Sequence, residues 1–180
     1  MKSSFSISDI TRISLLATLI CVSGYLIIPL PFSPVPATVQ SLAVMLTGSL
    51  LSPLHAFVTL LLFILLGTIG LPVFAGGSSG IGVLFGPTGG YLAGFVLGAV
   101  VISIVKGRKP DLLRYGLANL LGGLLVVYAL GILWLSQMTG MTLNNAFMVG
   151  AVPFLAGDVI KVFLAATIAW KTVPHLQRKY

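Results

Sequence analysis

Long apolar runs follow one another through this sequence, and they restrict what the chain can fold into more than any other feature. A helix needs about 20 mostly apolar residues to cross a bilayer, or fewer when neighbouring helices shield it. Six runs are candidates: Ile13–Ile28, Thr38–Leu51, Leu54–Leu71, Pro87–Val105, Leu112–Leu135 and Pro153–Lys171. Only 7% of the residues are charged, against about 25% in a typical soluble domain. The sequence therefore predicts an all-α integral membrane protein, a single transmembrane domain over residues 1–180 with six transmembrane helices.

The basic residues lie between these runs and indicate how the helices are oriented. They form three groups, before the first run, after the fourth and after the sixth: Lys2 and Arg12; Lys106, Arg108, Lys109 and Arg114; Lys171, Arg178 and Lys179. Because an even number of helices separates each group from the next, all three lie on one side of the membrane. Cytoplasmic loops carry the excess of Lys and Arg, and the loops at 29–37, 72–86 and 136–152 contain neither residue. We therefore expect cytoplasmic N and C termini in a multi-pass protein of the cell membrane, with a short surface helix within 143–152.

The same residue inventory argues against several functions. A net charge of +7 would suit nucleic-acid binding, but such proteins display a basic stripe on a folded face, whereas here the basic residues flank apolar runs. The sequence has no G-x-x-x-x-G-K-[ST] phosphate-binding loop and so does not hydrolyse ATP by that mechanism. Its two histidines, one cysteine and three aspartates are scattered. We expect no nucleic-acid partner, no metal, no cofactor and no catalytic centre.

Two outer loops differ in composition from plain connectors. PLPFSPVPATVQ, at 29–40, contains four prolines, which restrict the backbone and favour extended structure. LPVFAGGSSGIGVLFGPTGGY, at 71–91, is rich in glycine and serine but keeps apolar residues that a flexible linker would lack. We expect this second loop to fold over a ligand cavity near the outer face; a glycine-rich turn without a ligand is the alternative. The N–H groups of Thr88, Gly89 and Gly90, at the start of the next helix, could receive an anion.

The most unusual feature is a pair of opposite charges inside the last apolar run. Asp158 and Lys161, in the stretch GDVIK, lie three residues apart and therefore share one face of a helix. Each charge costs at least about 2.5 kcal/mol near the bilayer centre, so such residues usually face a cavity or the bundle interior. The pair could simply join two helices, but a buried ion pair is a weak source of stability. We favour a binding role, in which the pair receives a ligand with adjacent N–H and C=O groups.

Two further residues are candidates for the same cavity. Gln40 begins the second run at a comparable depth and offers both a donor and an acceptor, although a glutamine at the end of a span is more often only interfacial. Tyr91 directly follows the glycine-rich loop. We expect Tyr91 to close the cavity.

Small residues in the first run suggest close packing against another helix. Ser14 with Thr18, and Ala17 with Cys21, follow the small-xxx-small spacing that lets two helices approach closely in a membrane. The other helix could belong to a partner protein or to this chain.

Three stretches make the chain similar to the BioY family, the biotin-specific S components (substrate-capture subunits) of energy-coupling factor (ECF) transporters. They are PFSPVPATVQSLAVMLTG at 31–48, GLPVFAGGSSGIGVLFGPTGGYLAGF at 70–95 and GDVIK at 157–161. The resemblance covers essentially the whole chain, and it implies a six-helix capture subunit of a prokaryotic cell membrane. In that family the outer cavity binds biotin.

The resemblance also implies roles for individual residues. Asp158 and Lys161 would engage the ureido ring of biotin, and Ser78 would supply the polar contact that follows the double glycine, Gly76 and Gly77. Some members carry an arginine after the sequence G-G-Y, where this chain has Leu92. A salt bridge from that position to the biotin carboxylate is therefore absent, which leaves hydroxyl groups, water or the N–H groups of residues 88–90 to hold the carboxylate.

The partners that the resemblance implies are a transmembrane coupling protein and two ABC-type ATPase subunits. Members of the family dock on the coupling protein through an Ala-xxx-Ala motif in the first helix, where this sequence offers Ser14 with Thr18 or Ala17 with Cys21. The alternative function is a stand-alone or proton-coupled vitamin transporter in which Asp158 titrates during the cycle. Uptake by vesicles that follows a proton gradient without ATPases would favour that alternative.

Overall fold

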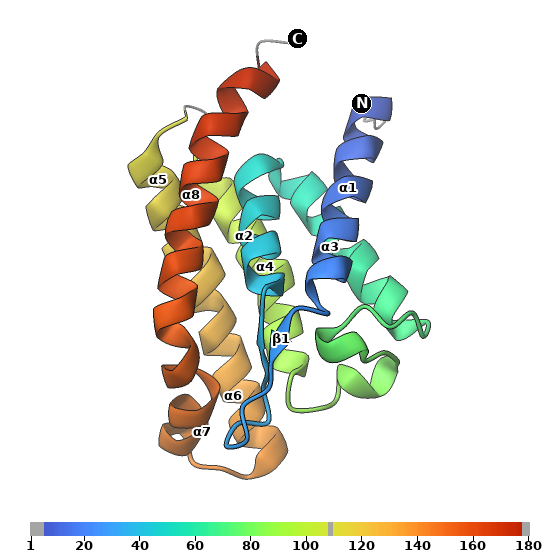
Figure 1. Ribbon diagram of the computed structural model, residues 1–180, viewed down its shortest axis with the longest axis vertical. Coiled ribbons are helices and arrows are strands. Elements are labelled where there is room, and N and C mark those ends of the chain that lie inside the picture. Colours follow the sequence, from blue (N-terminus) through green and yellow to red (C-terminus); the bar gives the residue numbers. More distant parts are fainter. Residues whose placement is uncertain (1–5, 108–109, 178–180) are drawn as a thin grey trace.

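The protein is a bundle of helices, shown in Figure 1 as a computed structural model that describes residues 6–107 and 110–177. Its helices are α1 (Ile7–Ser23), α2 (Gln40–Leu50), α3 (Pro53–Thr68), α4 (Gly89–Val105), α5 (Leu112–Ala118), α6 (Val127–Thr139), α7 (Leu143–Gly150) and α8 (Leu155–Gln177). A π-helical segment, η3 (Asn119–Val126), joins α5 to α6, and short 3-10 turns occur at Ala75–Gly77, Ile81–Val83 and Val152–Phe154. In the described part of the chain the strands are β1 (Ile27–Ile28) and β2 (Ala37–Thr38), which pair antiparallel.

The predicted all-α class is confirmed, since each of the six apolar runs contains a helix and α7 lies within the predicted surface helix at 143–152. The first helix ends at Ser23 rather than Ile28 because the chain turns at Gly24 and continues into β1. Two stretches, Leu112–Thr139 and Leu143–Pro174, are long and apolar enough to cross a membrane by length and composition. Pro53–Thr68 and Gly89–Val105 are shorter apolar helices.

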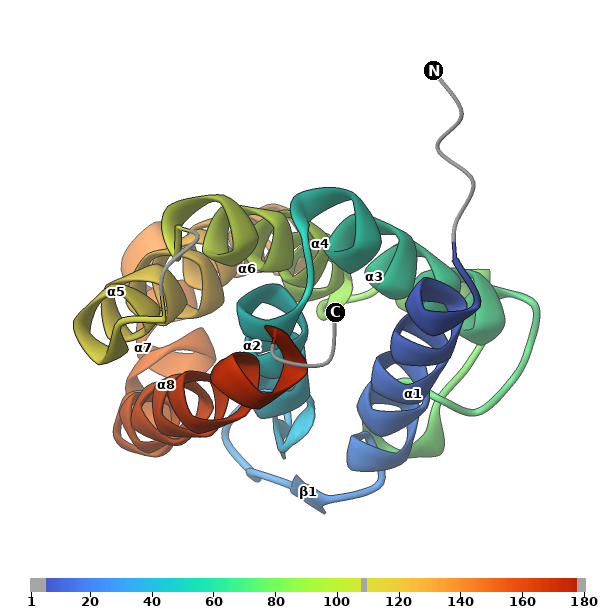
Figure 2. The same ribbon diagram turned by 90° about the horizontal axis from the view of Figure 1, so that it is seen from above.

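The helices surround α2, and different elements lie at the two ends of the bundle. The start of α1 and the end of α8 lie at the same end of the molecule, whereas α7 and the pair β1–β2 lie at the opposite end (Figure 1). Seen from above, α2 lies between α1 and α8 (Figure 2), and it also packs against α3, α4 and η3. With 11 residues, α2 is about 16 Å long, which is roughly half of a membrane's hydrocarbon core.

Glycines bring α4 very close to the helix that follows α5. A Cβ added at Gly98 would lie 2.4 Å from the carbonyl oxygen of Gly122, and one added at Gly94 would lie 2.9 Å from Cα of Val127. Only residues without a side chain allow backbones to approach this closely. The crossing fixes the position of η3 and α6 relative to α4, and with it the position of the side chains that α6 directs at the ligand cavity.

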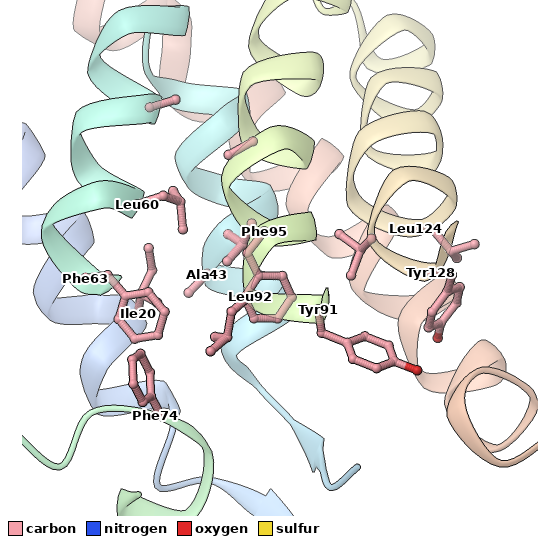
Figure 3. Packing of buried hydrophobic residues seen from close by; sticks show 14 of the residues in the cluster. Ile20, Ala43, Leu60, Phe63, Phe74, Tyr91, Leu92, Phe95, Leu124 and Tyr128 are labelled. Carbon is pink, nitrogen blue, oxygen red and sulfur yellow. The ribbon is translucent and has the colours of Figure 1, made fainter. Parts of the chain in front are cut away.

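Aromatic packing anchors the glycine loop, which we define as residues 71–88, to the bundle. Phe74 is 1% exposed and meets Phe63 of α3 in an edge-to-face contact, with ring centroids 5.4 Å apart and planes at 87°. Ile20 of α1 lies beside this pair (Figure 3). The expectation that apolar residues hold this loop in a folded state is met by Phe74.

Polar groups at the C-terminal end of α2 have hydrogen-bond partners within the protein. Asn119 donates to Ser49 Oγ at 3.0 Å and to the carbonyl of Tyr115 at 2.8 Å, so it links η3 to α2. Lys106, at the end of α4, donates to the carbonyls of Gly48 and Ser49, both at 2.9 Å, and to that of Leu51. An ammonium group at a helix C-terminus meets the negative end of the helix dipole. These contacts fix the C-terminal end of α2.

Candidate ligand-binding site

A cavity of about 540 Å³ lies at the end of the bundle opposite the chain termini. This volume is within the range of about 300–1,000 Å³ that is usual for small-molecule sites. Its walls come from the first turn of α2, the first two turns of α4 and α8, from η3 and α6, from the glycine loop, and from residues 34–38. Its apolar lining includes Val35, Phe74, Phe95, Val127 and Phe154.

The charged pair of α8 lies in this cavity. Asp158 and Lys161 both line it, and Lys161 Nζ is 2.7 Å from Asp158 Oδ1. Asp158 is 8% exposed. Both residues lie in α8, which begins at Leu155. Because they are three residues apart, about one helical turn, their side chains share the face that points to the interior. The expectation that the pair faces a chamber and not lipid therefore agrees with the structure.

Both charged groups of the pair are hydrogen-bonded to protein groups. Lys161 donates to Asp158 Oδ1, to the carbonyl of Thr38 at 2.7 Å and to Ser41 Oγ at 2.9 Å. Asp158 also accepts from the hydroxyl of Tyr128 at 2.6 Å on Oδ2 and from Ser41 Oγ at 3.3 Å on Oδ1. The carboxylate and the ammonium are thus both hydrogen-bonded to protein groups. A ligand must replace some of these bonds with bonds of its own.

Tyr128, Ser41 and the carbonyl of Thr38 were not among the residues predicted for the site. Ser41 directly follows Gln40 near the start of the second apolar run. This position beside a candidate residue could have identified Ser41 as a second polar candidate for the site. Tyr128 offered none, because a tyrosine inside an apolar run is common in a helix core. It follows the π-helical segment η3, a feature that often occurs near functional sites and shifts the direction of the side chains after it.

The residues predicted from the outer loops fall into two groups. Ser78, Thr88, Tyr91 and Gln40 line the cavity. Gly76 and Gly77 are not among its lining residues; their φ angles of 69° and 74° are ones that glycine adopts readily. The N–H of Gly76 donates to the carbonyl of Gly24 at 2.9 Å. These glycines therefore shape the loop and attach it to the end of α1.

Most of the polar lining away from the pair is already bonded to the protein. Gln40 Nε2 donates to the carbonyls of Val73 at 2.9 Å and Ile20 at 3.2 Å, which ties the glycine loop and α1 to α2. Ser78 Oγ donates to the carbonyl of Ala75 at 2.9 Å. Gln40 thus connects three elements around the cavity.

Tyr91 lines the cavity and is buried, and its role in closing the cavity stays a prediction. Its ring packs on Gly131 of α6, and its hydroxyl donates to the carbonyl of Gly150 at 2.8 Å. In the first turn of α4, the N–H of Gly89 donates to the carbonyl of Gly86 at 3.1 Å. Of residues 88–90, Thr88 alone is among those that line the cavity. The anion site at this helix start stays a prediction, and Thr88 is the residue of the three that borders the cavity.

The proline loop, which we define as residues 29–39, covers one side of the cavity. Its ends pair as β1 and β2, with Ile27 opposite Thr38 and Ile28 opposite Ala37. Near its middle, Ser33 Oγ donates to the carbonyl of Val149 in α7 at 2.7 Å. The same loop therefore contacts Lys161 through Thr38 and α7 through Ser33.

The small residues of α1 point in two directions. Ala17 is 3% exposed and Cys21 is 9% exposed, and both are packed inside the bundle. Ser14 and Thr18 are exposed, and the hydroxyl of Thr18 donates to the carbonyl of Ser14 at 2.8 Å, within the same helix. The pair that faces outward is thus Ser14 with Thr18.

The site offers binding chemistry based on one acidic and one basic group among apolar walls. In the described part of the chain no group of three or more His, Cys, Asp or Glu side chains is placed to hold a metal ion. A ligand that both donates N–H groups to the carboxylate and accepts from the ammonium fits the pair, and its apolar part fits the aromatic lining.

Comparisons with known proteins agree with this arrangement. The chain is 40% identical to the biotin transporter BioY of Thermotoga maritima over 161 residues, which cover 89% of this chain and 93% of the relative. It is 38% identical to the biotin transporter BioY of Rhizobium etli over 172 residues, which cover 91% of each. These relatives are transporters, which confirms the expectation that the chain is not an enzyme.

A solved structure has the same fold. It is the crystal structure of the S component for biotin from an ECF-type ABC transporter, which matches with a TM-score of 0.86 and 28% identity over 96% of this chain and 94% of the other. The family model of BioY matches residues 1–178. The chain therefore belongs to the BioY family.

Proposed function

We propose that this protein captures biotin at the outer face of the cell membrane, as the S component of an ECF-type transporter that partner ATPases energise. The observation that carries the proposal is the Asp158–Lys161 pair, buried in a closely walled cavity of about 540 Å³. The names of the relatives and of the solved S component, which are biotin transporters, support biotin as the ligand.

The geometry suggests how the ureido ring of biotin is recognised. In this arrangement an N–H group of the ureido ring donates to Asp158 Oδ1, the oxygen that accepts from Lys161 and Ser41 in the structure. Its carbonyl oxygen accepts from Lys161 Nζ, which at present also donates to Thr38 and Ser41. Tyr128 keeps Oδ2 of Asp158 occupied during this exchange. Each charged group then remains bonded in the bound state, so that binding does not leave a buried charge without a partner.

The apolar part of biotin has matching walls. The sulfur-containing ring and the alkyl chain pack against aromatic side chains such as Phe95, Phe154 and Phe74, which line the cavity. Burial of apolar surface contributes about 25 cal/mol per Å². The polar pair sets the orientation and the aromatic walls supply most of the affinity.

Docking on the transmembrane coupling protein is proposed at Ser14 and Thr18. Both residues are exposed on α1, among large apolar residues that are also exposed, namely Leu15, Leu19 and Val22. Small side chains at four-residue spacing let a partner helix approach the α1 backbone. Ala17 and Cys21 serve internal packing in this proposal, because both are buried.

Calorimetry on the purified full-length chain in detergent tests biotin capture directly. We expect saturable binding of one biotin per chain, and loss of that binding in Asp158→Asn while the variant keeps a cooperative melting transition. Absence of any heat or thermal shift with biotin in the folded wild type would refute the proposal. Uptake by vesicles with and without the ATPase partners then distinguishes ATP-driven transport from transport that follows a proton gradient.

A further inference from the structure

Charge around the cavity is confined to one wall. Among the described residues that line it, Asp158 and Lys161 are the ones with a formal charge, and their charges cancel. Between Arg12 and Lys106 the sequence contains no Asp, Glu, Lys or Arg. That stretch supplies α2, the glycine loop, the proline loop and all of α4. Every wall of the cavity that comes from these elements is therefore uncharged.

Lys161, the cation among the described residues that line the cavity, is paired with Asp158. Lys161 has three protons to donate, and they go to Asp158 Oδ1, Thr38 O and Ser41 Oγ. Its nearest charge is the carboxylate of Asp158 at 2.7 Å. An anionic group on the ligand would have to compete with Asp158 for this ammonium, and it would meet repulsion from the same carboxylate.

The described residues of the other walls carry neutral groups. Gln40 Nε2, Ser78 Oγ and the hydroxyl of Tyr91 donate to backbone carbonyls. Ser79 and Thr88 add two hydroxyl groups. The glycine loop also opens to solvent, since Ser78, Ser79 and Gly82 are exposed. A ligand end that reaches this loop meets water and hydroxyl groups instead of a cation.

From this distribution of charge we infer that the site recognises the ring end of its ligand and not the acid at the other end. Its ligands are then ureido-ring compounds whose side chain ends in a carboxylate or, equally, in a neutral amide, including biotin joined to an amine. The inference rests on the proposed function, because it assumes that the ureido ring occupies the Asp158–Lys161 pair. A carboxylate gains no ionic bond at the glycine loop, so its replacement by an amide removes none.

Competition binding with the purified full-length chain tests this inference. Labelled biotin at pH 7, where the acid is ionised, is displaced by unlabelled biotin, by biotinamide and by biotinyl-lysine. We expect dissociation constants within about threefold of one another, because no charge-assisted hydrogen bond is lost. An amide that binds more than about tenfold weaker than biotin overturns the inference and leaves biotin capture intact. If neither biotin nor its amides bind to the folded protein, both proposals fail.

Charge added to the glycine loop supplies a second test. Ser79→Lys and Thr88→Lys each place a cation at a residue that lines the cavity, whereas Phe85→Lys places it on an exposed residue of the same loop that is not among the lining residues. The two lining variants should favour the acid over the amide by up to about fivefold, the value of an exposed ion pair. Ser79→Gln and Phe85→Lys should leave the ratio unchanged. An unchanged ratio in both lining variants, with biotin still bound, overturns the placement of the acid end.

Discussion

Tyr128 donates its hydroxyl hydrogen to Oδ2 of Asp158 at 2.6 Å, from a helix that lies 30 residues earlier in the chain. This bond leaves Oδ1 as the carboxylate oxygen that faces Lys161 and Ser41. The orientation of the carboxylate is thus set from α6 as well as from α8. The position of the Tyr128 hydroxyl depends on the packing of η3 and α6 against α4, where Gly98 and Gly94 allow close contact.

The first prediction concerns Asp158 itself. Asp158→Ala and Asp158→Asn remove the anionic acceptor and leave Lys161 without its partner at 2.7 Å. Loss of one member of a buried, hydrogen-bonded charge pair costs about 2–5 kcal/mol in binding, so biotin affinity should fall by more than about 30-fold. Isothermal calorimetry on wild type and variants measures this loss. Near-equal affinities would reject the pair as the binding site.

The second prediction separates Tyr128 from the general packing of the bundle. Tyr128→Phe removes a hydrogen bond to a charged group, which is worth about 1.5–3 kcal/mol. We expect the biotin dissociation constant to rise by about tenfold or more, since the free carboxylate can rotate. Tyr115→Phe is the matched control, because Tyr115 is buried but is not among the residues that line the cavity. Similar losses of affinity in both variants would contradict an orienting role for Tyr128.

The third prediction addresses the contact of the proline loop with α7. Ser33→Ala removes the donor to the carbonyl of Val149 at 2.7 Å, which is one of the bonds that hold this loop over the cavity. We expect biotin to dissociate about five- to tenfold faster, the effect of losing about 1 kcal/mol of neutral hydrogen bonding. Ser136→Ala removes a comparable bond to the carbonyl of Met141, outside the cavity lining. Stopped-flow dissociation rates that change equally in both variants would show that the loop contact has no special role.

Most of the fold could be predicted from the sequence because apolar runs and their flanking charges reflect the cost of placing polar groups in lipid. Asp158 and Lys161 were predictable for the same reason, since a charge inside a span requires a partner or a cavity. Tyr128 was not, because its contact with Asp158 depends on where the bundle places α6 relative to α8. Nor could Gly76 and Gly77 be distinguished from lining residues, since their role is to form the turn that presents Ser78.

The fourth prediction tests the close crossing of α4. Gly98→Ala would place a Cβ 2.4 Å from the carbonyl of Gly122, and this backbone must move. Overpacking of this kind costs about 1–3 kcal/mol, so the melting temperature in detergent should fall clearly. Gly116→Ala on α5 is the control, because a Cβ there meets no atom within 4 Å beyond its own helix backbone and its chain neighbours. It should be neutral or slightly stabilising, since alanine favours helix. Equal melting temperatures for the two variants would be inconsistent with the packing at Gly98.

The fifth prediction distinguishes ligand capture from docking on the coupling protein. Thr18→Trp places a large side chain on the exposed face of α1. Thr18 is not among the residues that line the cavity. Biotin binding by the isolated chain should stay within about twofold of wild type, but ATP-driven uptake by the assembled transporter should be lost, because a bulky residue prevents close helix approach. Phe163→Trp, at an exposed position of α8, is the control and should preserve both activities. Normal assembly and uptake with Thr18→Trp would rule out the outward face of α1 as the docking surface.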